Sequence, residues 1–251
     1  MSSSTILPNT GDANATSGAH ASSDARCSFA LDAIRLFWIF VLCSVAGFVI
    51  EEVYHLAVYH EVQDRSGLLV GPFSPIYGVG AIVLTFIGIK ARRLPVPVLF
   101  LVSAAAGGAI EYTVSLGMEL GFGIAAWDYT GTWLSIDGRT NGYLMLMWGF
   151  LGVIYVRFGM PLLDRACSHL QQIPRWPTRA CVLFMTLNIA LTLVSLNCWY
   201  HRQAGEEPET PIQWVCASVM DDSFMAQRFQ TMAIAPELSL RVKQEAMEVE
   251  L

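Results

Sequence analysis

The sequence predicts an all-α protein, a polytopic bundle of about five transmembrane helices. Apolar residues form 54% of the chain and only 14% of its residues are charged, a balance too apolar for an ordinary soluble domain. The apolar residues also gather in blocks, several of which approach the length of about 20 residues that a helix needs to cross a bilayer. We therefore expect a multi-pass membrane protein.

Three regions are expected along the chain. Residues 1–33 are predicted to be a disordered N-terminal tail, because their first part is rich in Ser, Ala, Thr and Asn and lacks the basic start and apolar centre of a secretion signal. Residues 34–200 form the predicted transmembrane helical domain. Residues 201–251 are predicted to be an acidic C-terminal tail with short helices, because they contain nine Asp or Glu against four Lys or Arg.

Five blocks are the expected spans. Each is largely uncharged, and the loops between them carry basic residues or prolines. The fourth block is short, so its ends are the least well defined. The expected spans are residues 36–58, 73–89, 94–120, 142–156 and 180–200.

A stretch rich in glycine and proline precedes and enters the second span. It covers residues 67–81, GLLVGPFSPIYGVGA, and we call it the elbow. It lies in a run without charged residues from 66 to 89, so we expect a broken, non-helical segment at membrane depth. Such backbone is tolerated only where protein or a watery cavity covers its amides and carbonyls. The elbow therefore needs neighbours that hydrogen-bond to it.

Basic residues predict the orientation of the spans. Nine lie on one side of the bundle and three lie near the span ends on the other, and the positive-inside rule places the richer side in the cytoplasm. The N-terminus is then cytoplasmic, the C-terminus is extracytoplasmic, and the elbow faces outward. The nine are Arg26, Arg35, Lys90, Arg92, Arg93, Arg157, Arg165, Arg175 and Arg179, and the three are Arg65, Arg139 and Arg202.

Two carboxylates inside the spans, Glu51 and Glu111, are the first candidates for function, because ionisable residues there are costly and usually face protein or water. Residues four apart share a helix face, and Gly47 and Gly107 precede the two glutamates at that spacing. Membrane helices approach one another at such small residues, so both carboxylates are expected to point into the bundle. The rise of a helix places them about 24 and 27 Å above the cytoplasmic boundary, at a shared level.

These groups are expected to surround one outward-facing polar pocket. Its predicted substrate-binding residues are Glu51, Glu111, Pro75 and Tyr77, together with Trp127, Asp128 and Tyr129 from the loop before the fourth span. Two carboxylates that face each other at low dielectric cannot both ionise easily, which would suit proton-linked transport.

Simpler interpretations of the same residues stay open. A buried glutamate could hydrogen-bond the broken backbone of the elbow and hold the bundle together, or the carboxylates could be scattered over the surface. The loop residues 127–129 could be interfacial anchors beside a solvated Asp.

A family resemblance lies in four segments, AGFVIEE, GLLVGPFSPIYGVGA, GGAIEYTVSLGMELGFGIAAWDYTG and IDGRTNGYLMLMWGFLGVIYV. With these in order over about residues 36–156, the chain resembles the bacterial membrane family of ABC-transporter permeases of type IV. The resemblance implies a multi-spanning protein of the bacterial inner membrane with a transport function. The positions that fall on family motifs are Glu51, Gly71, Pro72, Pro75, Tyr77, Gly78, Glu111, Glu119, Trp127, Asp128, Tyr129, Gly138, Trp148 and Gly149.

Two positions depart from the family pattern. Ser74 stands where many relatives are expected to have a cysteine, which puts thiol-based chemistry in doubt, and Ala126 stands where a second tryptophan is common. The chain also has no GxxxxGK(S/T) phosphate loop, so an ATPase would be a separate subunit.

Three functions are compatible with these features. The leading hypothesis is a permease-like protein whose partners are the lipid bilayer, a small solute or ion and a separate ATPase subunit. The second is a membrane scaffold or regulatory subunit without transport, and a homo-oligomer is open in either case. The third is a membrane-embedded hydrolase with paired carboxylates, or with a metal held by carboxylates and His55 or Asp128. No catalytic residue or cofactor is assigned, and the acidic balance argues against nucleic acid as a partner.

Overall fold

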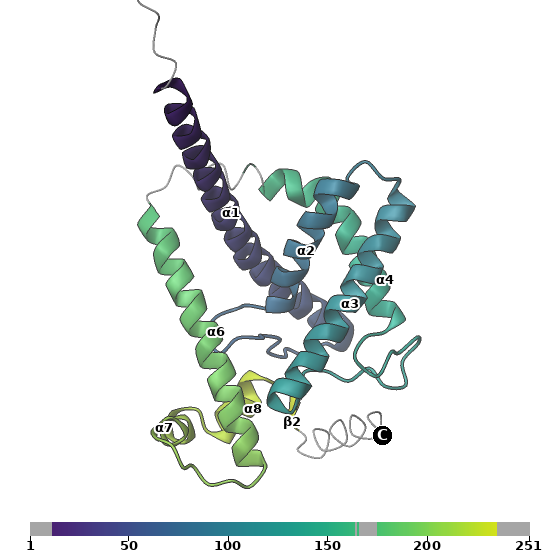
Figure 1. Cartoon of the computed structure of the whole chain (residues 1–251). Coiled ribbons are helices and arrows are strands. Elements are labelled where there is room, and N and C mark those ends of the chain that lie inside the picture. Colours follow the sequence, from purple (N-terminus) through teal and green to yellow (C-terminus); the bar gives the residue numbers. More distant parts are fainter. Residues whose placement is uncertain (1–11, 164, 166–174, 235–251) are drawn as a thin grey trace, which may run out of the picture.

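The structure is a computed structural model that describes residues 12–163, 165 and 175–234. Helices make up almost all the regular structure of this part (Figure 1), which confirms the predicted all-α fold. The helices are α1 (Asp12–Tyr59), α2 (Pro75–Ala91), α3 (Val96–Phe122), α4 (Gly142–Ile154), α6 (Arg175–Gln203), α7 (Pro211–Val219) and α8 (Asp222–Arg228). A π-helical turn, η1 (Tyr155–Gly159), follows α4, and two short strands, β1 (Ile124–Ala125) and β2 (Ala233–Ile234), pair antiparallel.

Four helical segments of the described residues are long and apolar enough to cross a membrane, so the chain is a multi-pass membrane protein. A fifth helix, α2, is apolar but has only 17 residues, and it corresponds to the predicted second span. The four longer segments are Ala33–Tyr59, Val96–Phe122, Gly142–Leu163 and Arg175–Gln203.

The fourth span is longer than the sequence predicted. Its helix runs from Gly142 through η1 to Leu163, past the expected end at residue 156. The guanidinium of Arg157 explains the difference, because it donates hydrogen bonds to the carbonyl oxygens of Arg92 at 2.5 Å and Leu94 at 2.7 Å. These carbonyls belong to the connection between α2 and α3, so the Arg157 charge is held at the end of the bundle and the helix continues.

Glycines allow the first four helices to pack closely. In this group α2 contacts α1 and α3, and α4 contacts α3. Trp148 of α4 lies between Gly80 of α2 and Gly107 of α3, where a Cβ atom on either glycine would collide with the indole. Gly47 of α1 lies against the ring of Tyr77 in the same way. The small-residue faces predicted from the sequence are therefore contact surfaces between helices.

The chain after α6 folds back onto the end of the bundle that holds the elbow (Figure 1). Strand β2 pairs with β1, which places Ile234 opposite Ile124. An apolar cluster then joins Leu69 of the elbow, Leu196 of α6 and Phe229, which follows α8. The described part of the predicted acidic tail is thus packed against the transmembrane helices.

The division into three regions stays a prediction. Residues 1–11 of the predicted N-terminal tail and 235–251 of the predicted C-terminal tail lie outside the described residues, and α1 begins at Asp12. The elbow, residues 123–141 and residues 204–234 gather toward one end of the bundle, whereas the α2–α3 connection lies at the other (Figure 1).

Candidate functional site

The first part of the elbow, residues 67–74, is not helical, and its fold begins with its own backbone. Gly67 donates its amide to the carbonyl of Phe73 at 2.8 Å, which closes the segment into a loop. Gly71 has a φ of 84°, a left-handed conformation that glycine adopts at little cost. The amide of Ser74 donates to the carbonyl of Ser44 in α1 at 3.0 Å, so the loop is attached to α1 where α2 begins.

Helix α6 provides polar side chains that pair with the middle of the elbow. Asn188 accepts a hydrogen bond from the Val70 amide at 3.0 Å and donates one to the Val70 carbonyl at 2.7 Å. Thr192, one turn later, accepts from the Leu69 amide at 2.9 Å. Asn188 and Thr192 are both buried, where an unpaired backbone amide would be costly. Helix α6 therefore supplies hydrogen bonds of the kind that the broken backbone of the elbow was expected to need.

Arg228, at the end of α8, also holds the elbow. Its guanidinium donates to the carbonyl oxygens of Leu68 at 2.7 Å and Gly71 at 2.5 Å and forms an ion pair with Asp64 at 2.6 Å. Burial alone would favour the neutral acid, but hydrogen bonds from Ser66 and the charge of Arg228 outweigh it and lower the pKa of Asp64. One cation therefore stabilises both the loop and the carboxylate before it.

These partners were not identified from the sequence. A signal existed in α6, where Asn188, Thr192 and Ser195 place polar groups on one face of an apolar helix. Arg228 had no such signal, because a single arginine in an acidic region resembles a surface charge. The alternative in which a buried glutamate holds the elbow does not describe these hydrogen bonds, since Asn188, Thr192, Arg228 and the Ser44 carbonyl make them.

The structure brings Glu51 and Glu111 together through two aromatic rings. The Tyr77 hydroxyl faces the Glu51 carboxylate, and the Tyr77 ring stacks on Trp148 with 5.5 Å between centroids. The Trp148 indole then donates a hydrogen bond to Glu111 Oε1 at 3.1 Å. We call these four residues the carboxylate–aromatic row. It takes one residue from each of α1, α2, α4 and α3, and Glu111 at its inner end is only 5% exposed.

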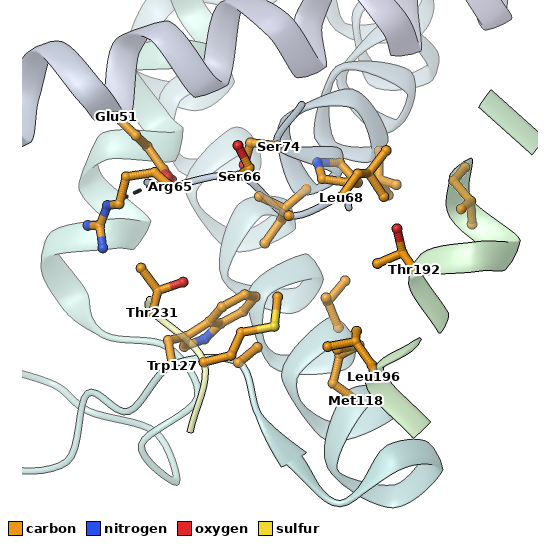
Figure 2. Close-up of a pocket in the computed structure, with 18 of the residues that line it drawn as sticks. Glu51, Arg65, Ser66, Leu68, Ser74, Met118, Trp127, Thr192, Leu196 and Thr231 are labelled. Carbon is orange, nitrogen blue, oxygen red and sulfur yellow. Dashed lines mark ion pairs between the residues drawn. The ribbon is translucent and has the colours of Figure 1, made fainter. Parts of the chain in front are cut away.

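A cavity of about 380 Å³ lies beside the Glu51 end of this row (Figure 2). It is bounded by α1, the elbow, α3, residues 126–129, α6 and residues 231–232. Four of the predicted binding residues line it, namely Glu51, Pro75, Trp127 and Tyr129. Its volume is in the range of small-molecule sites.

The other three predicted binding residues lie elsewhere. Tyr77 and Glu111 are behind the cavity wall, in the carboxylate–aromatic row. Asp128 is exposed, and its carboxylate accepts the amide of Thr130 at 2.8 Å. Hydrogen bonds from Thr130 lower the pKa of Asp128, so this residue shapes a surface turn.

A buried ion pair holds the loop that carries Trp127 and Tyr129. Arg139 pairs with Glu119 of α3 at 2.5 Å, and its carbonyl accepts a hydrogen bond from the Trp127 indole at 2.7 Å. Burial, followed by the charges of Glu111 and Glu51, raises the pKa of Tyr129, so its hydroxyl stays neutral. Glu119 thus helps to position the cavity-lining loop through Arg139, without lining the cavity itself.

The described residues contain no group of three or more His, Cys, Asp or Glu that could hold a metal ion. The His55 side chain instead lies 3.1 Å from the carbonyl of Glu61, and the Asp128 carboxylate accepts a hydrogen bond from Thr130 within a surface turn. The geometry therefore gives the hydrolase hypothesis no support.

A sequence model of the family described as "Putative ABC-transporter type IV" matches residues 38–195. The chain belongs to this family. The match begins in α1 and ends in α6, so the type IV region includes the elbow, the carboxylate–aromatic row and the elbow's partners Asn188 and Thr192. It confirms the resemblance and extends it beyond residue 156, while α7 and α8 lie outside the match. Comparison with curated proteins and with solved structures finds no match.

Proposed function

We propose that this type IV family member is a permease-like subunit that binds a small solute or ion in the cavity at the elbow. The observation that supports this function is the position of the cavity. It lies where α1, the elbow, α3 and α6 meet, and four residues selected from the sequence as binding groups line it. Pockets between helices of a bundle are common ligand sites.

Helix α6 is the element whose movement would open this cavity. Its contacts with the elbow are side-chain hydrogen bonds from Asn188 and Thr192 and the apolar packing of Leu196 with Leu69, whereas α1 to α4 pack through glycine contacts. Helix α6 also approaches α1 to α4 less closely than these helices approach one another, and elements with fewer packing contacts open more readily. A shift of α6 against the first four helices would therefore widen the cavity and release the solute.

The proposed orientation places the elbow and the cavity outside and the basic α2–α3 connection inside the cell. The sequence has no phosphate loop of its own, so an ATPase would be a separate subunit. This subunit would bind at the inner end, near Lys90, Arg92 and Arg93. Purification of the protein in mild detergent tests this partner. We expect a nucleotide-binding subunit to copurify, and repeated recovery of the protein alone would contradict the partnership.

Transport itself is tested by filling the cavity. Leu193→Trp places an indole in the cavity wall, whereas Leu187→Trp makes the same change on α6 at a position that is 60% exposed and outside the wall. Cells that lack the gene are supplied with wild type or either variant, and the solutes inside and outside them are compared by untargeted mass spectrometry. We expect wild type and Leu187→Trp to restore the solute distribution and Leu193→Trp to fail. A folded Leu193→Trp protein that restores it fully would favour the scaffold hypothesis.

A further inference from the structure

We propose that the ligand of this cavity is a single-chain amphiphile with a zwitterionic head. The head lies between Glu51 and Arg65, and the hydrocarbon chain fills the remainder of the cavity. This inference rests on the proposed function, because it names the solute class that the same cavity would bind.

The walls of the cavity favour a hydrocarbon chain. Away from Glu51 and Arg65, the lining is largely apolar, with apolar residues from α1, the elbow, α3 and α6 among others (Figure 2). Burial of apolar surface against such a wall is favourable, at about 25 cal/mol per Å². A hydrated ion or a sugar would lose water there without gaining hydrogen bonds, which is costly. The apolar side chains include Leu68, Ile76, Val79, Met118, Leu193 and Leu196.

The charged end of the cavity selects the head. Glu51 and Arg65 are the charged side chains in the described wall, and Figure 2 shows them together at one end of it. Arg65 Nε lies 3.9 Å from Glu51 Oε2, which is too long for a hydrogen bond. Each group is partly exposed, at 27% for the Arg65 side chain and 28% for that of Glu51. A ligand can therefore reach both.

The Arg65 guanidinium makes few hydrogen bonds within the described residues. Its Nε atom is buried and has no hydrogen-bond partner among the described residues, while Nη1 donates to Gln63 at 3.4 Å. The Nε atom is covered by protein, but the Arg65 side chain is 27% exposed, so a phosphate or carboxylate oxygen of a ligand can accept hydrogen bonds from the exposed part of the guanidinium. An anion alone would be repelled by the adjacent Glu51 carboxylate. A head that also carries an ammonium group matches both charges, which is why a zwitterion fits better than an acid or an amine.

The test uses three probes of equal chain length, namely a lysophosphatidylethanolamine, a fatty acid and a primary alkylamine. Binding to the purified full-length protein is measured by native mass spectrometry. We expect one lysophosphatidylethanolamine to bind, about tenfold more tightly than either single-charge probe, since a hydrogen bond to a charged group contributes about that factor. Equal binding of all three probes, or no binding of any, would overturn the inference.

Variants identify the site and the role of each charge. Leu193→Trp should weaken lysophosphatidylethanolamine binding about tenfold, and Val79→Trp provides a second filled cavity if Leu193→Trp does not fold. Leu187→Trp is the matched control and should bind as wild type does. Glu51→Gln should remove the preference over the fatty acid, and Arg65→Gln the preference over the alkylamine. Unchanged binding in both tryptophan variants would mean detergent-like adsorption and would overturn the site.

These results are separable from a failure of the proposed function. If Leu193→Trp abolishes the cellular solute effect while lysophosphatidylethanolamine does not bind, transport through the cavity stands and the amphiphile is the wrong solute. If the amphiphile binds in the cavity but Leu193→Trp cells behave as wild type, the site is real and transport is refuted.

Discussion

The indole of Trp148 donates a hydrogen bond to Glu111 Oε1 at 3.1 Å, which joins α4 to α3 inside the bundle. The two residues are 2% and 5% exposed. Trp148 reaches this position because Gly80 and Gly107 leave room for its ring. Glu111, which was selected from the sequence as a candidate binding residue, is thus also part of the helix packing. Its contribution to stability can be measured separately from a contribution to binding.

Substitution of Gly107 should destabilise the bundle. In Gly107→Leu, the new side chain collides with the Trp148 indole, and overpacking of this kind typically costs about 1–3 kcal/mol. We expect a lower Tm in detergent, measured by the intrinsic fluorescence of the protein. The control is Gly117→Leu on the same helix, where an added Cβ meets no atom within 4 Å. Equal Tm values for the two variants would contradict the close packing of Trp148.

Removal of the indole donor should leave Glu111 buried without its partner. Trp148→Phe keeps an aromatic ring against Tyr77 but loses the hydrogen bond to the carboxylate, and an unsatisfied buried acceptor costs about 1–3 kcal/mol. We expect a lower free energy of unfolding, measured by denaturant titration in detergent. Addition of Glu111→Leu to this variant should recover part of the loss, because no acceptor then remains. If the double variant is less stable than Trp148→Phe, the hydrogen bond is not the cause.

The sequence predicted the inner helix faces correctly because their signal is local. Ser103, Gly107, Glu111 and Ser115 recur every four residues and all are buried. A spacing of four residues is a property of one helix, so it can be seen without knowledge of its neighbours. The helix rise, another property of a single helix, predicted a common level for Glu51 and Glu111, and two rings connect these residues in the structure.

The partners of the elbow could not be predicted in this way, because they are distant in the chain. Arg228 lies 160 residues from Leu68, whose carbonyl it binds, and its own surroundings in the sequence are acidic and polar. Asp128 shows the opposite case, in which neighbours in the chain lie apart from each other's surroundings in space. It follows Trp127, which lines the cavity, yet its carboxylate caps an exposed turn. Adjacent residues in a loop point in different directions, and no periodicity reveals which one faces a site.

Loss of the Glu119 charge should detach the loop that carries Trp127. Glu119 and Arg139 form a buried pair, with side chains 4% and 12% exposed, and removal of one partner of such a pair costs about 3–5 kcal/mol. We expect Glu119→Gln to lower the Tm and to increase proteolysis within residues 123–141, measured by mass spectrometry of the fragments. The variant Glu119→Leu with Arg139→Met removes both charges and should be less destabilised. Fragments unchanged from wild type in Glu119→Gln would show that the ion pair does not hold the loop.

The ion pair of Asp64 with Arg228 should make stability depend on pH in the acidic range. Because the folded structure lowers the pKa of Asp64, this carboxylate contributes stability that is fully present above its unfolded pKa, about 3.9. The contribution is lost as the pH falls through the lower folded value. The Tm of wild type should therefore exceed that of Asp64→Asn at pH 6, and the difference should shrink as the pH falls below about 4. Glu61→Gln, a change at an exposed carboxylate three residues earlier, should show no such converging difference. A gap between wild type and Asp64→Asn that stays constant down to pH 3 would mean that the charge of Asp64 does not stabilise the elbow, and that Arg228 holds it through the carbonyl oxygens of Leu68 and Gly71 alone.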